Sequence, residues 1–163
     1  MSAEIVPDYR ELARILAPER STRSVALTNG CFDLLHVGHV RLIADARLEA
    51  DILVIALNSD ASARANKGES RPYVPLSERM EVLAALEGVA FVTSFDEPTA
   101  GPLLEALRPD VHIKGSDWTA ETVPERNVVI GYGGRIAICG DAKTHASSEL
   151  IRRLEGRGPD QEA

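Results

Sequence analysis

The most informative stretch of the chain is Thr28-Asn-Gly-Cys-Phe-Asp-Leu-Leu-His-Val-Gly-His39. A short apolar run, Val25 to Leu27, leads into it, and a helix-like pattern from Gly38 to Ala50 leads out of it. A strand, a glycine-containing turn and a helix N-terminus together can form an anion-binding site. Backbone N–H groups are unpaired there, and the helix dipole presents partial positive charge. The stretch therefore predicts a phosphate-binding turn after the first strand of the main sheet.

Two histidines, His36 and His39, stand three positions apart at the start of that helix, so both can reach one ligand. Gly38 between them lets a phosphate approach the backbone. Imidazoles donate hydrogen bonds to phosphate and, when protonated, neutralise charge that grows during phosphoryl transfer. A helix N-terminus disfavours a charged imidazole, but a bound triphosphate reverses that effect. Two alternatives are a structural role and half of a metal site, although the remaining histidines, His112 and His145, are distant.

Composition indicates one globular domain. The chain has 163 residues, of which 44% are apolar, and a formal net charge of −7. That charge argues against nucleic-acid and membrane-surface binding, yet permits a local positive pocket. No apolar run approaches the ~20 residues of a membrane span, and no secretory signal is evident. Two cysteines form no disulfide framework, so we expect a reduced, cytoplasmic protein.

The pattern of apolar residues predicts a Rossmann-like α/β sandwich of three layers around a five-stranded, mainly parallel sheet. The run Ile52 to Leu57 is continuously apolar, which is typical of a strand covered on both faces. Strands are expected at 25–28, 52–57, 89–93, 110–114 and 135–139. Helices are expected at 8–17 (ended by Pro18), 38–50, 61–65, 77–88 (from an N-cap at Ser77 to a terminator at Gly88), after Pro102 and at 147–155, with a loose tail at 156–163. The apolar stretch at 127–132 fits either a strand or a helix.

Polar residues follow two of these strands at their carboxyl ends, where ligands bind in open α/β sheets. Asn58 and Asp60 follow the second strand, although Asp60 or Ser59 could simply cap the next helix. Lys114 to Trp118 follow the fourth strand. These positions predict one binding edge shared with the phosphate turn.

The polar segment from Asn66 to Pro75 carries Lys67 and Arg71, which could fold over a triphosphate or be solvated. Arg79 lies in the first turn of the next helix, where the helix dipole disfavours a cation. It needs a partner, either a neighbouring glutamate (Glu78 or Glu81) or a group in the site.

The stretch from Thr28 to His39 resembles the signature of the cytidylyltransferase-like nucleotidyltransferase superfamily. Five further motifs follow in the order of that superfamily: Asn58-Ser-Asp60, Lys67-Gly-x-x-Arg-Pro72, Glu78-Arg-Met80, Lys114-Gly-x-Asp-Trp118 and Tyr132-Gly-Gly-Arg135. The resemblance covers residues 24–154 and is strongest to the adenylyltransferases of bacterial heptose biosynthesis. It implies transfer of AMP from ATP to heptose 1-phosphate with Mg²⁺ held mainly by substrate phosphates, and a homodimer. It also implies that the stretch at 127–132, before Gly133, is a short helix.

The resemblance also implies roles for individual residues. It assigns catalytic roles to His36, His39 and Lys67. It assigns nucleotide binding to Thr28, Asn29, Gly30, Cys31, Phe32, Gly38, Asn58, Asp60, Arg79, Ser147 and Ser148. It assigns acceptor binding to Asp33, Lys114, Gly115, Asp117 and Trp118. The chain departs from the usual pattern at Ala146, where relatives carry a hydroxyl, and at Ser116, where they often carry glycine.

Two other functions fit the same residues. A CTP-dependent enzyme such as glycerol-3-phosphate cytidylyltransferase shares the His-x-Gly-His core. A nucleotide sensor could keep the fold without the chemistry; the intact His36 and His39 argue against it, whereas Ala146 leaves it open. Substitution of either histidine should abolish turnover in an enzyme and spare the regulatory output of a sensor.

Overall fold

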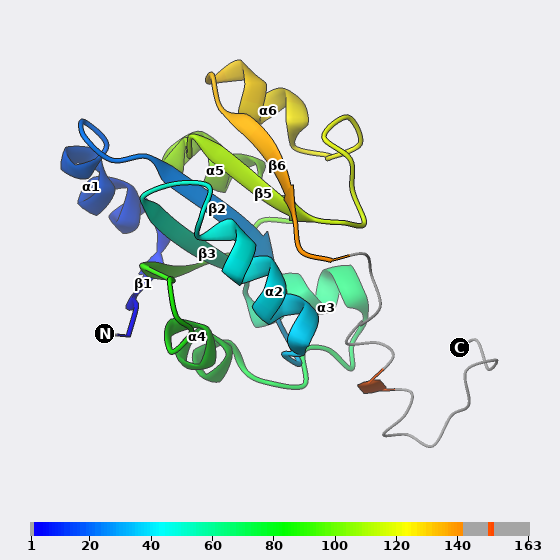
Figure 1. The fold of residues 1–163 in the computed structure, drawn as a ribbon. Helices are drawn as coiled ribbons and strands as arrows, with labels where there is room; N and C mark the ends of the chain where they lie inside the picture. The colour runs from blue at the N-terminus through cyan, green and yellow to red at the C-terminus, as the bar shows by residue number, and fades with distance from the viewer. Residues whose placement is uncertain (1, 142–149, 152–163) are drawn as a thin grey trace.

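A computed structural model describes residues 2–141, 150 and 151, and in these residues a six-stranded sheet carries helices on both faces (Figure 1). The strand order is β1-β4-β3-β2-β5-β6, and every neighbouring pair is parallel. The strands are β1 (Glu4–Asp8), β2 (Val25–Gly30), β3 (Ile52–Asn58), β4 (Phe91–Phe95), β5 (Val111–Gly115) and β6 (Arg135–Cys139).

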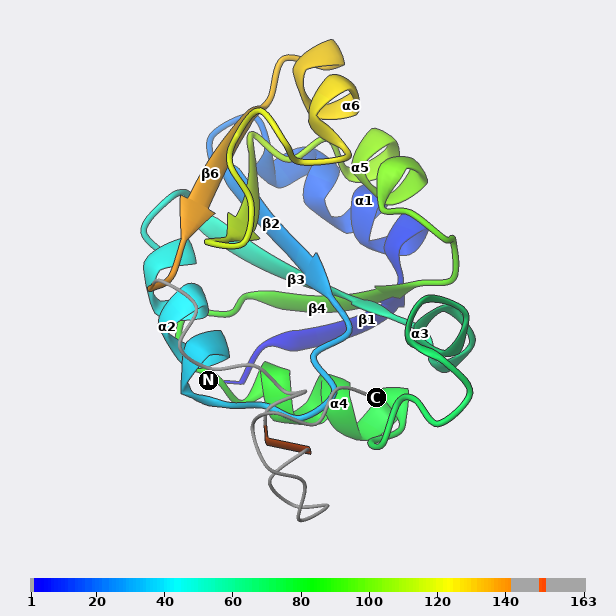
Figure 2. The same cartoon turned by 90° about the vertical axis from the view of Figure 1, so that its right-hand side faces the viewer.

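The helices form the outer two layers of the sandwich. They are α1 (Tyr9–Glu19), α2 (Val37–Ala46), α3 (Asp60–Lys67), α4 (Leu76–Ala84), α5 (Gly101–Leu107) and α6 (Arg126–Gly131). Helices α1, α5 and α6 cover one face of the sheet, and α2 and α4 cover the other (Figure 2). The predicted Rossmann-like α/β sandwich is confirmed.

Alternating side chains of the central strands supply the two halves of the core. In β3, Ile52, Val54 and Ala56 pack with α1 and α5. The alternate residues Leu53, Ile55 and Leu57 pack with α2 and α4. All six are at most 2% exposed. Burial on both faces explains why this strand is continuously apolar in sequence.

Strand order positions the site. From β2 the chain crosses to β3 on one side, and the later strand β5 pairs with β2 on the other side. Ligands in such sheets bind at the carboxyl ends of the strands flanking this change of direction. The turn after β2, the start of α2, and the residues after β3 and β5 all lie at that edge.

Several element boundaries differ from the predictions. The sheet has a sixth strand, β1, in which only Val6 is buried. Pro18 lies inside α1, which continues to Glu19. Ser77 is not the N-cap of α4, because that helix starts one residue earlier, after Pro75 and without a side-chain cap. The same helix ends at Ala84, ahead of the predicted terminator. The prediction of a helix at 127–132 is confirmed by α6.

The predicted last helix and tail lie outside the described residues, except for Leu150 and Ile151, which are helical. In the described part of the chain, no helix combines the length and hydrophobicity required to cross a membrane.

Candidate active site

The two histidines of the phosphate turn form a reciprocal cap at the start of α2. His36 is the N-cap residue, and its Nδ1 accepts a hydrogen bond from the N–H of Gly38 at 3.1 Å. The Nδ1 of His39 accepts from the backbone N–H of His36 at 3.3 Å, and the ring centroids are 3.9 Å apart. An imidazole nitrogen that accepts carries no proton, so these bonds assign the proton of each neutral ring to Nε2.

His39 is uncharged without a ligand. Burial, together with smaller electrostatic effects of His36 and Lys67, lowers its pKa from 6.5 to about 4. The ring of Phe32 packs beside it with centroids 5.3 Å apart. A neutral imidazole with its proton on Nε2 can donate to a phosphate oxygen, and its burial avoids the free-energy cost of desolvating a charged ring. The charge of a bound triphosphate acts in the opposite direction and raises this pKa.

The turn between β2 and α2 is tightly built. Phe32 has a φ of 48°, which is left-handed backbone, and a Cβ on Gly30 would approach the Phe32 ring to 3.2 Å. Cys31 is 6% exposed, and burial raises the pKa of its thiol although Lys67 and Arg79 act in the other direction. Its thiol therefore remains protonated at neutral pH. Thr28 lies buried within β2.

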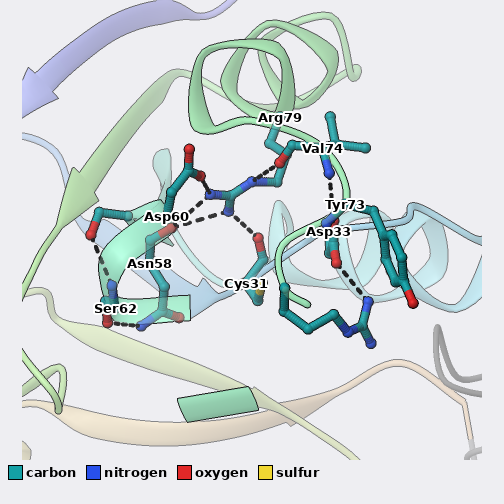
Figure 3. A network of polar contacts seen from close by, with 10 residues as sticks. Cys31, Asp33, Asn58, Asp60, Ser62, Tyr73, Val74 and Arg79 are labelled. Carbon is teal, nitrogen blue, oxygen red and sulfur yellow. Dashed lines mark hydrogen bonds and ion pairs between the residues drawn. The ribbon is translucent and has the colours of Figure 1, made fainter. Parts of the chain in front are cut away.

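Asp33 fastens the segment between α3 and α4 to the phosphate turn (Figure 3). Its Oδ1 accepts from the N–H groups of Tyr73 and Val74 at 2.8 and 3.0 Å, and its Oδ2 pairs with Arg71 at 2.6 Å. The side chain is only 2% exposed. Because both oxygens are engaged, Asp33 anchors this segment here, a different role from the acceptor contact expected of it.

Arg79 joins four parts of the site (Figure 3). Its guanidinium donates to the carbonyls of Val74, Cys31 and Asn58 at 2.5 to 3.1 Å, and it pairs with Asp60 at 2.7 Å. The side chain is fully buried. The alternative of a pair with Glu78 or Glu81 is wrong, since Asp60 is its carboxylate partner. Arg79 positions the segments around it and, because its side chain is buried in this conformation, it cannot contact a nucleotide directly.

Asn58 and Asp60 lie at the end of β3, as predicted. The amide of Asn58 donates to the hydroxyl of Ser62 at 3.0 Å, and Ser59 caps α3 by accepting from the backbone of Ser62. Asp60 is 35% exposed at its side chain, so it retains surface beyond its pair with Arg79. Capping thus belongs to Ser59, and Asp60 can still meet a ligand.

Lys67 is the last residue of α3 and is exposed. Its charge lowers the pKa of both His39 and Cys31, so its ammonium acts on the phosphate turn although it follows a different strand. The charge of Lys67 therefore acts at the same edge of the sheet as His36 and His39. In the segment between α3 and α4, residues 71–74 are anchored by Asp33.

Lys114 at the end of β5 is mostly buried. Its Nζ donates to Oδ1 of Asn29 at 3.0 Å and lies 3.3 Å from Glu125. Burial lowers its pKa, and the carboxylate of Glu125 opposes that effect. Gly115 follows at the same edge, and Asp117 and Trp118 are exposed beyond it. Ser147 and Ser148, the other predicted phosphate contacts, lie outside the described residues.

Sequence reasoning missed two residues of this edge. His112 is completely buried in β5 and bonds Asn29, and Glu125 precedes α6 and pairs with Lys114. The first had a signal, because a histidine between Val111 and Ile113 interrupts an apolar strand. The second had none, because its loop carries no motif.

The profile of the cytidylyltransferase-like family matches residues 27–153, which is most of the chain and includes every element of this site. The chain belongs to the cytidylyltransferase-like family. It is therefore a nucleotidyltransferase, and the histidine pair lies where the family signature was recognised.

Curated relatives match over nearly the whole chain. It is 46% identical over 138 residues to the bifunctional protein HldE of Syntrophotalea carbinolica, covering 85% of this chain and 28% of that protein. The HldE protein of Geobacter sulfurreducens is 46% identical over 144 residues, covering 88% and 29%. That of Caulobacter vibrioides is 42% identical over 150 residues, covering 91% and 31%. The chain thus spans under a third of the length of these relatives.

Solved structures agree on the fold. A lipopolysaccharide core biosynthesis protein from Thermoplasma volcanium superposes with a TM-score of 0.64 at 22% identity, covering 74% of this chain and 99% of that one. Pantothenate synthetase from Thermus thermophilus superposes with a TM-score of 0.61 at 17% identity, covering 83% and 60%. At these identities the likeness concerns architecture alone.

Proposed function

We propose that this nucleotidyltransferase transfers AMP from ATP to heptose 1-phosphate, giving ADP-heptose and pyrophosphate for surface-glycan synthesis. The observation that carries the proposal is the capped pair of neutral histidines at the start of α2, with the charge of Lys67 acting on it. The identity of 40 to 46% to HldE proteins supports the choice of acceptor, which the motifs had suggested.

The reaction is an in-line displacement. An oxygen of the sugar phosphate attacks the α-phosphorus of ATP, a new P–O bond forms, and the bond to the bridging oxygen breaks so that pyrophosphate leaves with the electron pair. The attacking phosphate is already ionised at pH 7 and needs no general base. The protein's task is to position both substrates and stabilise charge.

Each catalytic residue has a task that matches its environment. The Nε2–H groups of His36 and His39 donate to phosphate oxygens, and the bond from His39 strengthens as negative charge grows in the transition state. Lys67 neutralises the departing pyrophosphate from its place at the end of α3. Backbone N–H groups of the turn and the start of α2 add donors that need no protonation.

Mg²⁺ fits this site as a companion of the triphosphate. In the described residues, no group of three or more histidine, cysteine, aspartate or glutamate side chains could hold a metal ion. Asp33 in the turn and Asp60 after β3 are each paired with an arginine. We therefore expect phosphate oxygens and water to hold the ion, which supplies charge neutralisation.

Pyrophosphate release tests the proposal. Purified protein with Mg²⁺ is assayed with ATP and with CTP, each against heptose 1-phosphate and glycerol 3-phosphate. Turnover with ATP and the heptose alone is the expected result. Turnover with CTP and glycerol 3-phosphate would replace it with the cytidylyltransferase reaction. Nucleotide binding with no turnover for any pair would instead favour the sensor.

A further inference from the structure

The side-chain amide of Asn29 is held in one orientation at the end of β2. Its Oδ1 accepts from the Nζ of Lys114 at 3.0 Å and lies 3.0 Å from the Nε2 of His112. An ammonium can only donate, so the shared atom must be the amide oxygen and the His112 nitrogen must carry a proton. The amide NH₂ therefore points away from both residues, and it donates to no other described residue.

His112 occupies a place where an apolar residue would be expected. It is 0% exposed between Val111 and Ile113, and its Nδ1 is buried with no hydrogen-bond partner among the described residues. A buried polar atom without a partner destabilises the fold, whereas leucine there would not. Burial also keeps the ring neutral, since its pKa falls to about 3. The bond to Asn29 is the one hydrogen bond that the His112 side chain makes in the described part of the chain.

The second donor is itself anchored. Lys114 lies 3.3 Å from the carboxylate of Glu125, and both side chains are 11% exposed. This pairing holds the ammonium against Asn29 and offsets its charge. A polar chain therefore runs beneath the binding edge from Glu125 through Lys114 to the Asn29 amide, and His112 joins it from the same strand as the lysine.

We propose that His112 is a positioning residue of the nucleotide site, which together with Lys114 holds the Asn29 amide so that its NH₂ group donates to an oxygen of the bound nucleotide. The inference rests on the proposed nucleotidyl transfer. If the amide turned over, its carbonyl oxygen would face the phosphates and repel them. Asn29 directly precedes the glycine of the phosphate turn, so its amide lies at the correct edge of the sheet.

A double-substitution cycle in the full chain tests this role. The variants are His112→Leu, Asn29→Ala and both together, compared with wild type. Calorimetry gives the Kd for Mg·ATP and Mg·CTP, pyrophosphate release gives kcat/KM, and urea unfolding gives stability. We expect each single substitution to lower kcat/KM about 10- to 100-fold, and the double variant to be no worse than Asn29→Ala, because one amide carries both effects.

Conservative variants separate positioning from folding. His112→Gln places an amide donor near the original Nε2 and should retain activity within threefold, whereas His112→Asn places it near Nδ1 and should behave like leucine. Stability of His112→Leu should equal or exceed that of wild type. Ile113→Val, a change at the next buried position of β5 on its other face, is the matched control and should leave kcat/KM unchanged.

Two results would overturn the role: kcat/KM and the Kd for Mg·ATP of His112→Leu both within twofold of wild type, or losses that multiply in the double variant. If the leucine variant does not fold, the comparison of glutamine with asparagine decides, and equal activity of the two refutes the proposal. The binding measurements need no acceptor. A wrong sugar phosphate would therefore refute the proposed reaction while the nucleotide Kd values still decide the role of His112.

Discussion

At the level of single residues, the histidine pair resolves a conflict between charge and position. A helix N-terminus repels a cation, yet the chemistry calls for donors to phosphate. The Nδ1 atoms of His36 and His39 accept backbone N–H groups, which fixes the protons on Nε2 and satisfies the helix start at the same time. The rings can therefore donate while neutral, and the ligand itself supplies the field that favours protonation.

This arrangement predicts different outcomes for two amide substitutions at His39. His39→Asn keeps an acceptor near Nδ1 for the backbone of His36 but loses the Nε2–H group. We expect kcat to fall about 100- to 1,000-fold, with the free energy of unfolding within about 0.5 kcal/mol of wild type. Single-turnover kinetics and urea unfolding measure the two quantities.

His39→Gln is the companion variant, because it keeps a donor near Nε2 and gives up the cap. It should retain more activity than asparagine and lose about 1 kcal/mol of stability. Equal kcat for the two amides would contradict the assignment of the proton to Nε2.

At the level of elements, Arg79 connects four segments that are distant in sequence. It donates to carbonyls at the end of β2, at the end of β3 and before α4, and it pairs with the first residue of α3. Such a fork suits arginine and no other side chain, because five N–H donors lie in one plane. The geometry of the phosphate turn relative to α3 therefore depends on one buried guanidinium.

Arg79→Lys should accordingly be severe although it conserves charge. A single ammonium cannot reach carbonyls of Val74, Cys31 and Asn58 together, so buried acceptors lose their partners. We expect a loss of about 3 kcal/mol in the free energy of unfolding. Arg41→Lys is the matched control: its pair with Asp141 is about half exposed, and its cost should stay below about 0.5 kcal/mol. Equal costs in urea unfolding would refute the structural role of Arg79.

Elements with a strong apolar period were predictable, and their polar connections were not. Strand β3 was predictable because a strand that is buried on both faces needs apolar residues at every position. The phosphate turn was predictable from its glycine and histidine motif. Strand β1 was missed because it is an edge strand with one buried residue, Val6, and a proline beside it. The partners of Asp33 lie 38 to 41 residues away and those of Arg79 lie 5 to 48 residues away, so only the folded chain brings them together.

At the level of the whole molecule, the predicted catalytic residues converge although they come from two crossover units. His36 and His39 follow β2, and Lys67 follows β3 through α3. Parallel strands bring their carboxyl ends to one edge, so the order of the sheet makes this convergence predictable without side-chain geometry. The buried polar chain below that edge was not predictable, because hydrogen bonds between neighbouring strands leave no period in the sequence.

The two buried histidines also give the molecule a characteristic response to acid. Burial lowers the pKa of His39 to about 4 and that of His112 to about 3, from an ordinary value of 6.5. Between pH 6.5 and 4 the unfolded chain therefore binds protons that the folded chain does not, so stability rises with pH across this window and is lost as pH falls. Each histidine should account for about 2 kcal/mol between pH 7.5 and 5.

Urea unfolding at several pH values between 7.5 and 5 measures this loss, and His112→Leu isolates one of its two sources. We expect the wild-type protein to lose about twice as much stability over the range as the leucine variant. Staying at or above pH 5 keeps the titration of carboxylates small, because their ordinary pKa values lie near 4. Parallel curves for the two proteins would mean that His112 is protonated in the folded state. That would contradict its burial as a neutral ring.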